Sequence, residues 1–400
     1  MIKAAILGYG TVGSGVYEII RKNARTIERK VGQALDIKYI LDIRDFDNHP
    51  EKHLFTKNFD DILNDDEVKI VVEVMGGLHP AYDFSKAALL AGKNVITSNK
   101  ELVATHGTEL LKIAEEQNVN YMFEASVGGG IPIIRPLNLC LAANEIEEIY
   151  GILNGTANFI LTKMFAEGAS FDDALSEAQR LGYAERNPAA DVEGHDACRK
   201  IAILASLASG NFVDYSRIPT IGITGITKSD VVFAEKLGCV IKLIGYAKID
   251  KNEKVYACVC PMVISKEHKL ADVNDVFNAI LVHGDAIDDV MFYGRGAGKL
   301  PTASAVVADV IDAAKHVHTH IRLSWKQPEN DIFMDPEEVT ARYMIRTPDA
   351  ELFKNFDNAQ IVGEHIGEHG KEYAFVTDRM TEKELAEHLQ ARGTYIRMLA

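Results

Sequence analysis

The sequence has few cysteines, a deficit of basic residues and no long apolar run. Five cysteines, an odd number spread over 400 residues, argue against a disulfide scaffold and suggest free thiols in a reducing compartment. Lys plus Arg total 43 against 58 Asp plus Glu, and the net charge of −15 disfavours binding to nucleic acid or to an anionic membrane. No apolar run approaches the roughly 20 residues of a membrane span, and no signal-peptide core stands near the first residue. We therefore expect a cytoplasmic protein that acts on small molecules.

Apolar residues make up 47% and charged residues 25% of the chain, as in ordinary folded proteins. At 400 residues the chain exceeds the size at which one hydrophobic core stops growing, so more than one domain is expected. In the first third, the expected strands are 2–7, 37–43, 70–75, 94–98 and 120–125, and the expected helices are 14–30, 80–91 and 107–117. This alternation predicts a Rossmann-type, doubly wound parallel sheet of the α/β class.

The alternation changes after the glycine run at 128–130. The elements expected there are strands at 147–153, 240–249 and 255–264, and helices at 157–167, 171–181, 195–209 and 302–315. Beyond a proline-containing linker, the tail has the order strand, short helix, strand, strand, helix, strand, which is typical of a ferredoxin-like, ACT-like module. We predict a dinucleotide-binding domain at 1–126 with 300–322 packing back on it, an α+β catalytic and dimerisation domain at 127–299, a linker at 323–338 and the ACT-like module at 339–400.

A glycine-rich loop follows the first expected strand. Gly8, Gly10 and Gly13 have the spacing G-x-G-x-x-G between an apolar strand and an amphipathic helix. The first glycine permits a tight turn, the second lets the backbone approach a pyrophosphate, and the third packs the helix against the strand. The helix N-terminus adds positive potential. This context predicts a dinucleotide-binding loop formed by Gly8, Gly10, Thr11, Val12 and Gly13.

The residues after the second expected strand bear on the choice between NAD and NADP. An acidic residue there accepts hydrogen bonds from the ribose of NAD, whereas an arginine contacts the 2′-phosphate of NADP. The sequence supplies both, as Asp42 and Arg44. Strand alternation places the two on one face, where they also suit a plain surface ion pair. The choice of cofactor therefore stays open, with a preference for NADP.

Two lysines are candidates for chemistry. Lys100 follows an expected strand at the carboxyl edge of the sheet, where doubly wound folds place their ligand crevice, although a structural lysine is the alternative. Asp196 and Lys200 are four residues apart on an expected helix, on a face that also carries apolar residues. A solvated pair rarely occupies such a face, so we expect this pair to face a cleft. Burial would favour the neutral amine and Asp196 the ammonium, a balance that suits proton transfer near neutral pH.

Metal sites are less clearly indicated. Glu124 precedes a glycine run whose carbonyl groups, together with one carboxylate, could surround a hard cation, but a tight interdomain turn explains the same pattern. Cys258 and Cys260 lie on an expected strand without a second Cys or His pair at ligand spacing. Buried thiols are therefore favoured over zinc.

Several motifs occur in one order along residues 2–320. They are Gly8–Gly15, Thr97–Lys100, Glu124–Pro132, Leu153–Asn158, Gly182–Lys200 and Gly296–Ala305. Together they resemble the motifs of the homoserine dehydrogenase family. The resemblance implies reversible oxidation of L-homoserine to L-aspartate 4-semialdehyde with NAD or NADP, a step toward threonine, methionine and isoleucine.

The resemblance also implies roles for individual residues. Lys200 is expected to exchange the proton of the alcohol or aldehyde oxygen, and Lys100 to polarise the same oxygen. Substrate binding and the orientation of Lys200 are expected from Glu185, Asp191, Asp196 and Thr156. The expected cofactor contacts are Gly8, Gly10, Thr11, Val12, Gly13, Arg44, Ser98, Lys100, Gly182 and Gly298. A monovalent cation, Na⁺ or K⁺, maps onto Glu124 and the carbonyls of Val127, Gly129 and Ile131, and a homodimer or homotetramer is expected.

Two features depart from the family pattern. The segment Arg346–Leu352 stands where regulatory modules of the family carry a Pro-Gly turn, so we expect the tail to serve docking or oligomerisation rather than threonine feedback. Asp42 beside Arg44 weakens a firm assignment of NADP. The alternatives are another semialdehyde or polyol dehydrogenase, or a nucleotide sensor without catalysis. A sensor would have no use for the lysines and carboxylates that the resemblance assigns to catalysis.

Overall fold

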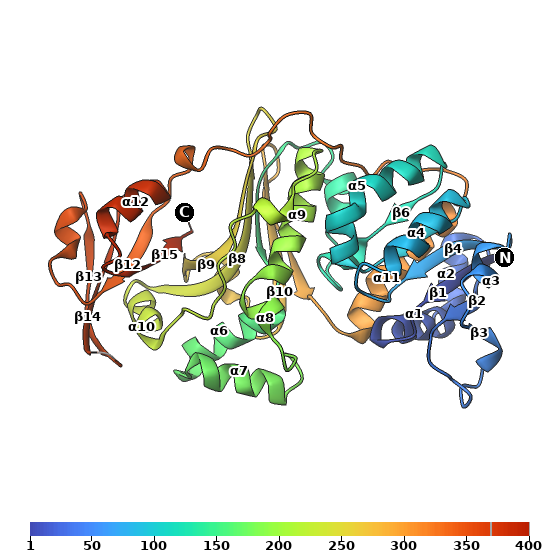
Figure 1. Cartoon of the computed structure of the whole chain (residues 1–400), viewed down its shortest axis with the longest axis horizontal. Coiled ribbons are helices and arrows are strands. Elements are labelled where there is room, and N and C mark those ends of the chain that lie inside the picture. Colours follow the sequence, from blue (N-terminus) through green and yellow to red (C-terminus); the bar gives the residue numbers. More distant parts are fainter. Residues whose placement is uncertain (369, 400) are drawn as a thin grey trace. The chain divides into compact units, whose positions relative to one another are not determined.

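The computed structural model describes residues 1–368 and 370–399, which form two compact units (Figure 1). Unit 1 comprises residues 1–145, 202–214 and 294–329, and unit 2 comprises residues 146–201, 215–293 and 330–399. Among residues 1–368 and 370–399, no helix is both long enough and apolar enough to cross a membrane.

Unit 1 is built on a parallel sheet of six strands, sheet A. The strand order, β3-β2-β1-β4-β5-β6, is that of a doubly wound dinucleotide-binding fold, which confirms the predicted parallel sheet. The strands are β1 (Ile2–Leu7), β2 (Leu35–Leu41), β3 (Phe55–Thr56), β4 (Val68–Glu73), β5 (Asn94–Thr97) and β6 (Tyr121–Met122). The helices and turns are α1 (Thr11–Lys22), α2 (Ala24–Val31), η1 (Lys52–Leu54), α3 (Asp60–Leu63), α4 (Ala81–Leu90), α5 (Lys100–Glu116), η2 (Glu124–Ser126), η3 (Pro136–Cys140) and α11 (Lys299–Lys315).

Helices cover both faces of sheet A (Figure 1). Alternate residues of β1, among them Ala4 and Ile6, are buried against Val16 of α1 and Val306 of α11. The helices α1, α2 and α11 therefore share one apolar core, to which residues far apart in the sequence contribute. On the sheet's other face, α4 and α5 pack together.

Several elements of unit 1 differ from the prediction. The helix expected at 107–117 begins earlier, at Lys100, and η1, β3, α3 and η3 were not expected. The single helix expected at 14–30 is two helices, because the backbone leaves helical geometry at Asn23, which caps α1. Strand β2 ends at Leu41, so Asp42 and Arg44 lie in the turn that follows and do not alternate along a strand. Strand β6 is only two residues long, and the chain turns at once into η2.

Unit 2 is built on a mixed sheet of nine strands, sheet B, with the order β11-β10-β7-β8-β9-β15-β12-β14-β13. The strands of its first part are β7 (Ile146–Ile152), β8 (Cys239–Ile249), β9 (Val255–Ser265), β10 (Phe277–Gly284) and β11 (Asp288–Arg295). The helices and turns are α6 (Gly155–Glu167), α7 (Phe171–Arg180), α8 (Ala189–Val192), α9 (His195–Ser209), η4 (Tyr215–Arg217), α10 (Lys228–Lys236) and η5 (Lys269–Asp272). Residues 195–201 of α9 belong to unit 2, and its remaining residues belong to unit 1. The hairpin β10–β11 and helix α10 were not predicted from the sequence.

The C-terminal elements follow the order expected from the sequence. They are η6 (Pro336–Glu338), β12 (Tyr343–Thr347), η7 (Leu352–Asn355), β13 (Gln360–Gly367), β14 (Gly370–Val376), α12 (Glu382–Leu389) and β15 (Thr394–Met398). The short helix is reduced to the single turn η7. Strand β15 pairs in parallel with β9, so these strands continue sheet B. The assignment of this segment as an ACT-like module remains a prediction.

A buried ion-pair cluster joins the C-terminal strands to α10. Arg346 of β12 donates from Nε to Asp230 Oδ1 at 2.7 Å, and also donates to the carboxylate of Glu372 on β14. The side chains of Asp230 and Glu372 are 3% and 13% exposed. Lys236, at the end of α10, donates to the carbonyl of Glu364 at 2.6 Å. The C-terminal strands are therefore docked on α10 of the same chain.

Candidate active site

Two predicted residues lie together on α9. Lys200 Nζ donates to Asp196 Oδ2 at 2.7 Å and to the carbonyl oxygen of Leu153 at 2.8 Å. The two side chains are 10% and 8% exposed. The predicted helix is confirmed, and the expectation that the pair faces a cleft stays a prediction. A buried ammonium is costly to desolvate, so these two acceptors are what allows Lys200 to remain inside.

Asn154 connects the carboxylates of this site and was missed as a functional residue. Its Nδ2 donates to Asp191 Oδ1 at 2.7 Å and to Asp196 Oδ2 at 2.9 Å. Its Oδ1 accepts from the N–H of Ala157 at 2.8 Å and so caps α6. The sequence signal for the cap is an Asn at the start of an expected helix. The contacts with Asp191 and Asp196, however, depend on tertiary structure.

Two other predicted substrate residues lie elsewhere in unit 2. Thr156, in the first turn of α6, is buried and donates to the carbonyl of Tyr183 at 2.6 Å. Glu185 is exposed between α7 and α8. No recorded contact in the described chain joins Glu185 to Lys200 or Asp196. The structure therefore brings together Asp191, Asp196 and Lys200, but not Glu185.

The glycine loop has the geometry that a dinucleotide site requires. Gly8 has a φ of +96°, which favours glycine. A Cβ on Gly13 would lie 1.9 Å from the carbonyl oxygen of Gly8, so no larger residue fits there. Gly10 is the N-cap of α1, and a Cβ there would meet nothing within 4 Å. Thr11 and Val12 begin α1, whose N-terminal N–H groups suit an anion.

Asp42 and Arg44 form an ion pair beside this loop. Arg44 donates from Nε to Asp42 Oδ1 at 2.9 Å and from Nη2 to Oδ2 at 2.8 Å. The N–H of Tyr9, within the glycine loop, also donates to Asp42 Oδ2 at 2.8 Å. Hydrogen bonds from Arg44 hold the pKa of Asp42 well below its usual range. The pair forms through a turn and not through strand alternation, and the Arg44 side chain remains 57% exposed.

The carboxyl edge of sheet A carries Lys100 and a carboxylate that the sequence analysis missed. Lys100 is the first residue of α5, directly after the half-exposed Ser98 and the cap residue Asn99. Glu73, at the end of β4, is fully buried and accepts from Thr97 Oγ1 at 2.6 Å. Burial raises the pKa of Glu73. The burial of Glu73 could not be predicted from the sequence, because a carboxylate at the end of a strand is usually exposed. It is buried here because strands on both sides of β4 cover it.

The predicted cation ligand Glu124 has a different side-chain environment from the one expected. Its carboxylate accepts from the N–H groups of Ile133, Ile134 and Arg135, the last at 2.9 Å. These N–H groups precede the π-helical turn η3, so the carboxylate acts as an N-terminal cap. Within the described residues there is also no cluster of three or more His, Cys, Asp or Glu side chains suited to a metal. The carboxylate oxygens of Glu124 are therefore engaged by main-chain N–H groups and do not face a cluster of other metal-ligating side chains.

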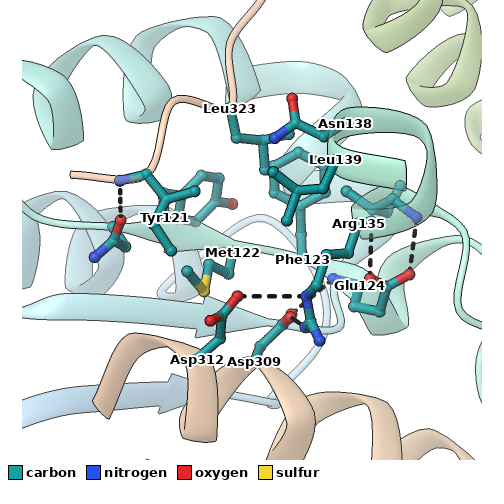
Figure 2. Close-up of a pocket in the computed structure, with 13 residues that line it drawn as sticks. Tyr121, Met122, Phe123, Glu124, Arg135, Asn138, Leu139, Asp309, Asp312 and Leu323 are labelled. Carbon is teal, nitrogen blue, oxygen red and sulfur yellow. Dashed lines mark hydrogen bonds and ion pairs between the residues drawn. The ribbon is translucent and has the colours of Figure 1, made fainter. Parts of the chain in front are cut away.

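Arg135 connects the same region to α11. Its guanidinium lies between two carboxylates of α11, forming an ion pair with Asp309 and another with Asp312 (Figure 2). Asp309 also accepts from the N–H of Glu124 at 2.8 Å. Burial raises the pKa of Asp309 to about 7. This network fixes both ends of the segment that contains the glycine run.

The glycine run itself is tightly packed within unit 1. The N–H of Gly130 donates to the carbonyl of Arg295 at 3.0 Å, and a Cβ on Gly129 would lie 2.1 Å from the carbonyl oxygen of Gly296. In the described residues, the turn and loop N–H groups donate to other acceptors than the carbonyls of Val127, Gly129 and Ile131. Their oxygens are the donor type that hard cations prefer.

The remaining predicted cofactor residues are two glycines. Gly182 follows α7 in unit 2 with a φ of +76°, and Gly298 precedes α11 in unit 1 with a φ of +122°. Both glycines therefore occupy turns at the end of a helix. The five cysteines are free thiols, and Cys258 and Cys260 are buried, as expected from the sequence.

These features define a class of enzyme. The open helix N-terminus after the glycine loop suits a pyrophosphate, and hydride transfer between a dinucleotide and a carbon leaves an oxygen whose proton must be exchanged. A buried lysine held by a carboxylate suits that exchange. The fold and the site are those of a nicotinamide dinucleotide-dependent oxidoreductase.

Comparison with known proteins specifies the class further. Residues 8–124 match the family model for the homoserine dehydrogenase NAD-binding domain, and residues 132–311 match the homoserine dehydrogenase model. The homoserine dehydrogenases of Synechocystis and Bacillus subtilis are 45% and 40% identical over 78% and 86% of this chain, covering 73% and 81% of their own lengths. The crystal structure of a homoserine dehydrogenase from Thiobacillus denitrificans superposes with a TM-score of 0.91 at 36% identity, covering 100% of this chain and 98% of its own. A hyperthermophilic archaeal homoserine dehydrogenase in complex with NADPH gives a TM-score of 0.65 at 30% identity, covering 78% of this chain and 97% of its own.

The chain belongs to the homoserine dehydrogenase family. The protein is thus an oxidoreductase that acts on a CH–OH group and interconverts L-homoserine and L-aspartate 4-semialdehyde with NAD(P). In this family the reaction serves amino-acid biosynthesis. The resemblance stated from the sequence motifs is confirmed.

Proposed function

We propose that Lys200 exchanges the proton of the reacting oxygen in this reaction. The observation that carries the proposal is the hydrogen bonding of its ammonium, which has three N–H donors. Within the described residues, the recorded contacts use two of them, at Asp196 and Leu153. The third donor is left for the hydroxyl or aldehyde oxygen of the substrate. Bound NAD(P) would supply or accept the hydride.

Asp196 and Asn154 act as positioning residues for Lys200. Asp196 fixes the direction of the ammonium, because its carboxylate accepts a charge-assisted hydrogen bond from Lys200 Nζ at 2.7 Å. Asn154 donates to both Asp191 and Asp196, which reduces the repulsion between two neighbouring carboxylates. Asp191 and the exposed Glu185 are proposed to bind the substrate ammonium. Thr156, in the first turn of α6, is proposed as a further substrate-binding residue.

The dinucleotide is proposed to bind along the glycine loop and the carboxyl edge of sheet A. The pyrophosphate would lie at the N-terminus of α1, near Gly10, Thr11 and Val12, with Ser98 and Lys100 toward the nicotinamide, and with Gly182 and Gly298 as further contacts. Lys100 would polarise the same substrate oxygen as Lys200. We favour NADP, because the exposed Arg44 can turn from Asp42 to a 2′-phosphate, as an Arg beside a ribose site commonly does.

A monovalent cation is proposed at the carbonyls of Val127, Gly129 and Ile131. The donor set fits such an ion because it consists of carbonyl oxygens in a loop held at both ends. Glu124 would support this loop by capping η3 and would contribute at most its main-chain oxygen. The cation would fix the loop and would take no part in hydride transfer.

The predicted division of the chain is retained as a proposal. Residues 1–126 with 300–322 would bind the dinucleotide, 127–299 would carry catalysis and dimerisation, 323–338 would link, and 339–400 would form a docked, ACT-like module. The buried contact of Arg346 with Asp230 supports docking. A homodimer or homotetramer located in the cytoplasm is proposed from the family and from the free cysteines.

The test is the absorbance of reduced nicotinamide when the full chain meets L-homoserine with NAD and with NADP in parallel. Lys200→Ala should lower turnover by roughly 10² to 10⁴-fold, the usual contribution of one acid–base group. Lys251→Met, which changes an exposed lysine of the same unit, is the control. Near-normal turnover in the Lys200 variant would refute the proposed role.

A further inference from the structure

Unit 2 contains a cavity of about 200 Å³ on the face of sheet B that lies opposite α9. On β8, Gly245 faces α9, since a Cβ built there would lie 3.2 Å from the Cβ of Ile201. The next residue, Tyr246, lines the cavity. Successive residues of a strand point to opposite faces, so the sheet separates the cavity from Lys200.

The cavity is large enough for a small organic molecule. A cavity of about 150 Å³ is known to hold benzene, and this one is larger. Part of its wall is apolar and consists of Met262 on β9, Met398 on β15, the neighbouring Leu399, and Met334, Val339 and Ala341. The rest is formed by charged side chains, two tyrosines and Thr340.

The buried Arg397 lines this cavity and has little anionic compensation. Its side chain is 9% exposed, and its Nη1 donates to the hydroxyl of Tyr256. The carboxylate recorded near it within the described chain is that of Glu382, 3.9 Å away and itself 53% exposed. The sulfurs of Cys258 and Cys260 also lie near the guanidinium, and the hydrogen bond with Cys260 together with the positive charge of Arg397 lowers the pKa of Cys258. A guanidinium has five N–H donors, so most of those of Arg397 remain for a partner in the cavity.

Other charges around the cavity leave it with a positive excess. Arg379 donates to the carbonyl of Thr340 at 3.0 Å and to its hydroxyl at 3.4 Å, which are neutral partners. Lys248 Nζ is 3.9 Å from Glu148, whose carboxylate already accepts from the hydroxyl of Tyr246 at 2.9 Å. Among the side chains that line the cavity, three are cationic, those of Lys248, Arg379 and Arg397, and two are carboxylates, those of Glu148 and Glu338. Glu382, near Arg397, is 53% exposed and does not line the cavity.

We propose that this cavity binds a small organic carboxylate, which Arg379 and Arg397 would hold while a short apolar part contacts Met262 and Met398. The planar guanidinium matches the two oxygens of a carboxylate and is the side chain best suited to this pairing. The half-exposed Lys248 adds a third positive charge. The site is separate from the substrate site, so its ligand would be an additional one.

The test uses the full chain and succinate as the probe. Thermal unfolding is followed while disodium succinate is titrated, and sodium chloride at matched ionic strength serves as the reference. Binding to the folded state should give a saturable rise in Tm of a few degrees that chloride does not give. Arg379→Gln should raise the half-saturating concentration by roughly 10-fold or more, because a charge-assisted hydrogen bond is lost.

A second test variant and one control variant make the outcome decisive. Arg379 is exposed, so its replacement leaves no buried gap, whereas Arg397→Gln removes a buried side chain and is used only if it folds. Arg392→Gln changes an exposed arginine of the same unit that pairs with Asp349, and it should leave the titration unchanged. A succinate effect that equals that of chloride, or that persists unchanged in Arg379→Gln, would overturn the proposal.

Discussion

The amide of Asn154 and the carboxylate of Asp196 lie 2.9 Å apart, although 42 residues separate them in the chain. The same amide reaches Asp191 at 2.7 Å, so both of its N–H donors are used on carboxylates. Asp196 in turn accepts from Lys200 at 2.7 Å. The direction of the Lys200 ammonium therefore depends on a residue that starts α6, and Asn154 can be tested separately from Lys200.

Replacing Asn154 with aspartate should impair turnover and change its pH dependence. Asn154→Asp keeps an oxygen that can cap α6, but it replaces two N–H donors with a third carboxylate beside Asp191 and Asp196. Loss of a hydrogen bond to a charged group costs about 1.5–3 kcal/mol, which corresponds to a loss in kcat/KM of roughly 10- to 100-fold. Part of the loss should be regained toward lower pH, where the added carboxyl group is protonated.

The measurement is the pH profile of kcat/KM for L-homoserine in the wild type and the variant. Asn252→Asp, in the exposed turn between β8 and β9, adds the same charge away from the site and serves as the control. If Asn154→Asp retained the wild-type profile, the proposed positioning role would be wrong.

The ion pair between Asp42 and Arg44 predicts how cofactor choice should respond to substitution. Arg44→Ala should lower the kcat/KM for NADP by roughly 10-fold or more relative to that for NAD, because the 2′-phosphate loses a charged hydrogen-bond donor. Asp42→Asn should shift the preference further toward NADP, because it removes a negative charge near that phosphate. The ratio of kcat/KM values for the two cofactors is the measurement. Arg25→Ala, at an exposed position of α2, is the control, and an equal loss for both cofactors would contradict the assignment.

The buried Lys242 predicts a rise in stability at alkaline pH. Its ammonium donates to the carbonyl of Val273 at 2.6 Å and to Asn274 Oδ1 at 3.0 Å. Burial lowers the pKa of Lys242 from 10.5 to about 8. Between these values the unfolded chain binds more protons at this residue than the folded protein does, so the contribution of Lys242 to the free energy of unfolding increases with pH.

Lys242→Met removes this contribution. The free energy of unfolding of the wild type, measured relative to the variant, should increase by up to about 3 kcal/mol from pH 8 to pH 10.5. Denaturant titrations at several pH values measure the difference. The exposed Lys251→Met should show no such trend. A difference that stays constant with pH would show that Lys242 keeps its ordinary pKa in the folded protein.

The docking of the C-terminal strands predicts an enzyme that threonine does not inhibit. Arg346 is held by Asp230 of α10 and by Glu372 of β14, and the helix expected after β12 is reduced to η7. A segment fixed in this way has little freedom to respond to an effector. Turnover of L-homoserine should therefore be undiminished at saturating L-threonine. Marked cooperative inhibition would show instead that the segment regulates the enzyme.

The sequence alone determined the features that depend on local spacing. The G-x-G-x-x-G loop between strand and helix placed Gly8, Gly10 and Gly13 correctly, because turn closure and helix packing are decided by neighbouring residues. The i,i+4 spacing of Asp196 and Lys200 likewise determined that they share a face of α9. The alternation of apolar runs with helical spacing was sufficient to predict the parallel sheet.

Only the tertiary structure decided which distant side chains meet. Asn154 reaches Asp191 and Asp196 because the start of α6 lies beside α8 and the first turn of α9, and no local pattern encodes that packing. Glu124 became a cap for η3, although the sequence suggested a metal ligand, because its carboxylate meets three N–H groups nine to eleven residues later. The pairing of β15 with β9 is equally non-local. Hydrogen bonds and burial at such positions depend on how elements pack, and the period of a single segment does not contain that information.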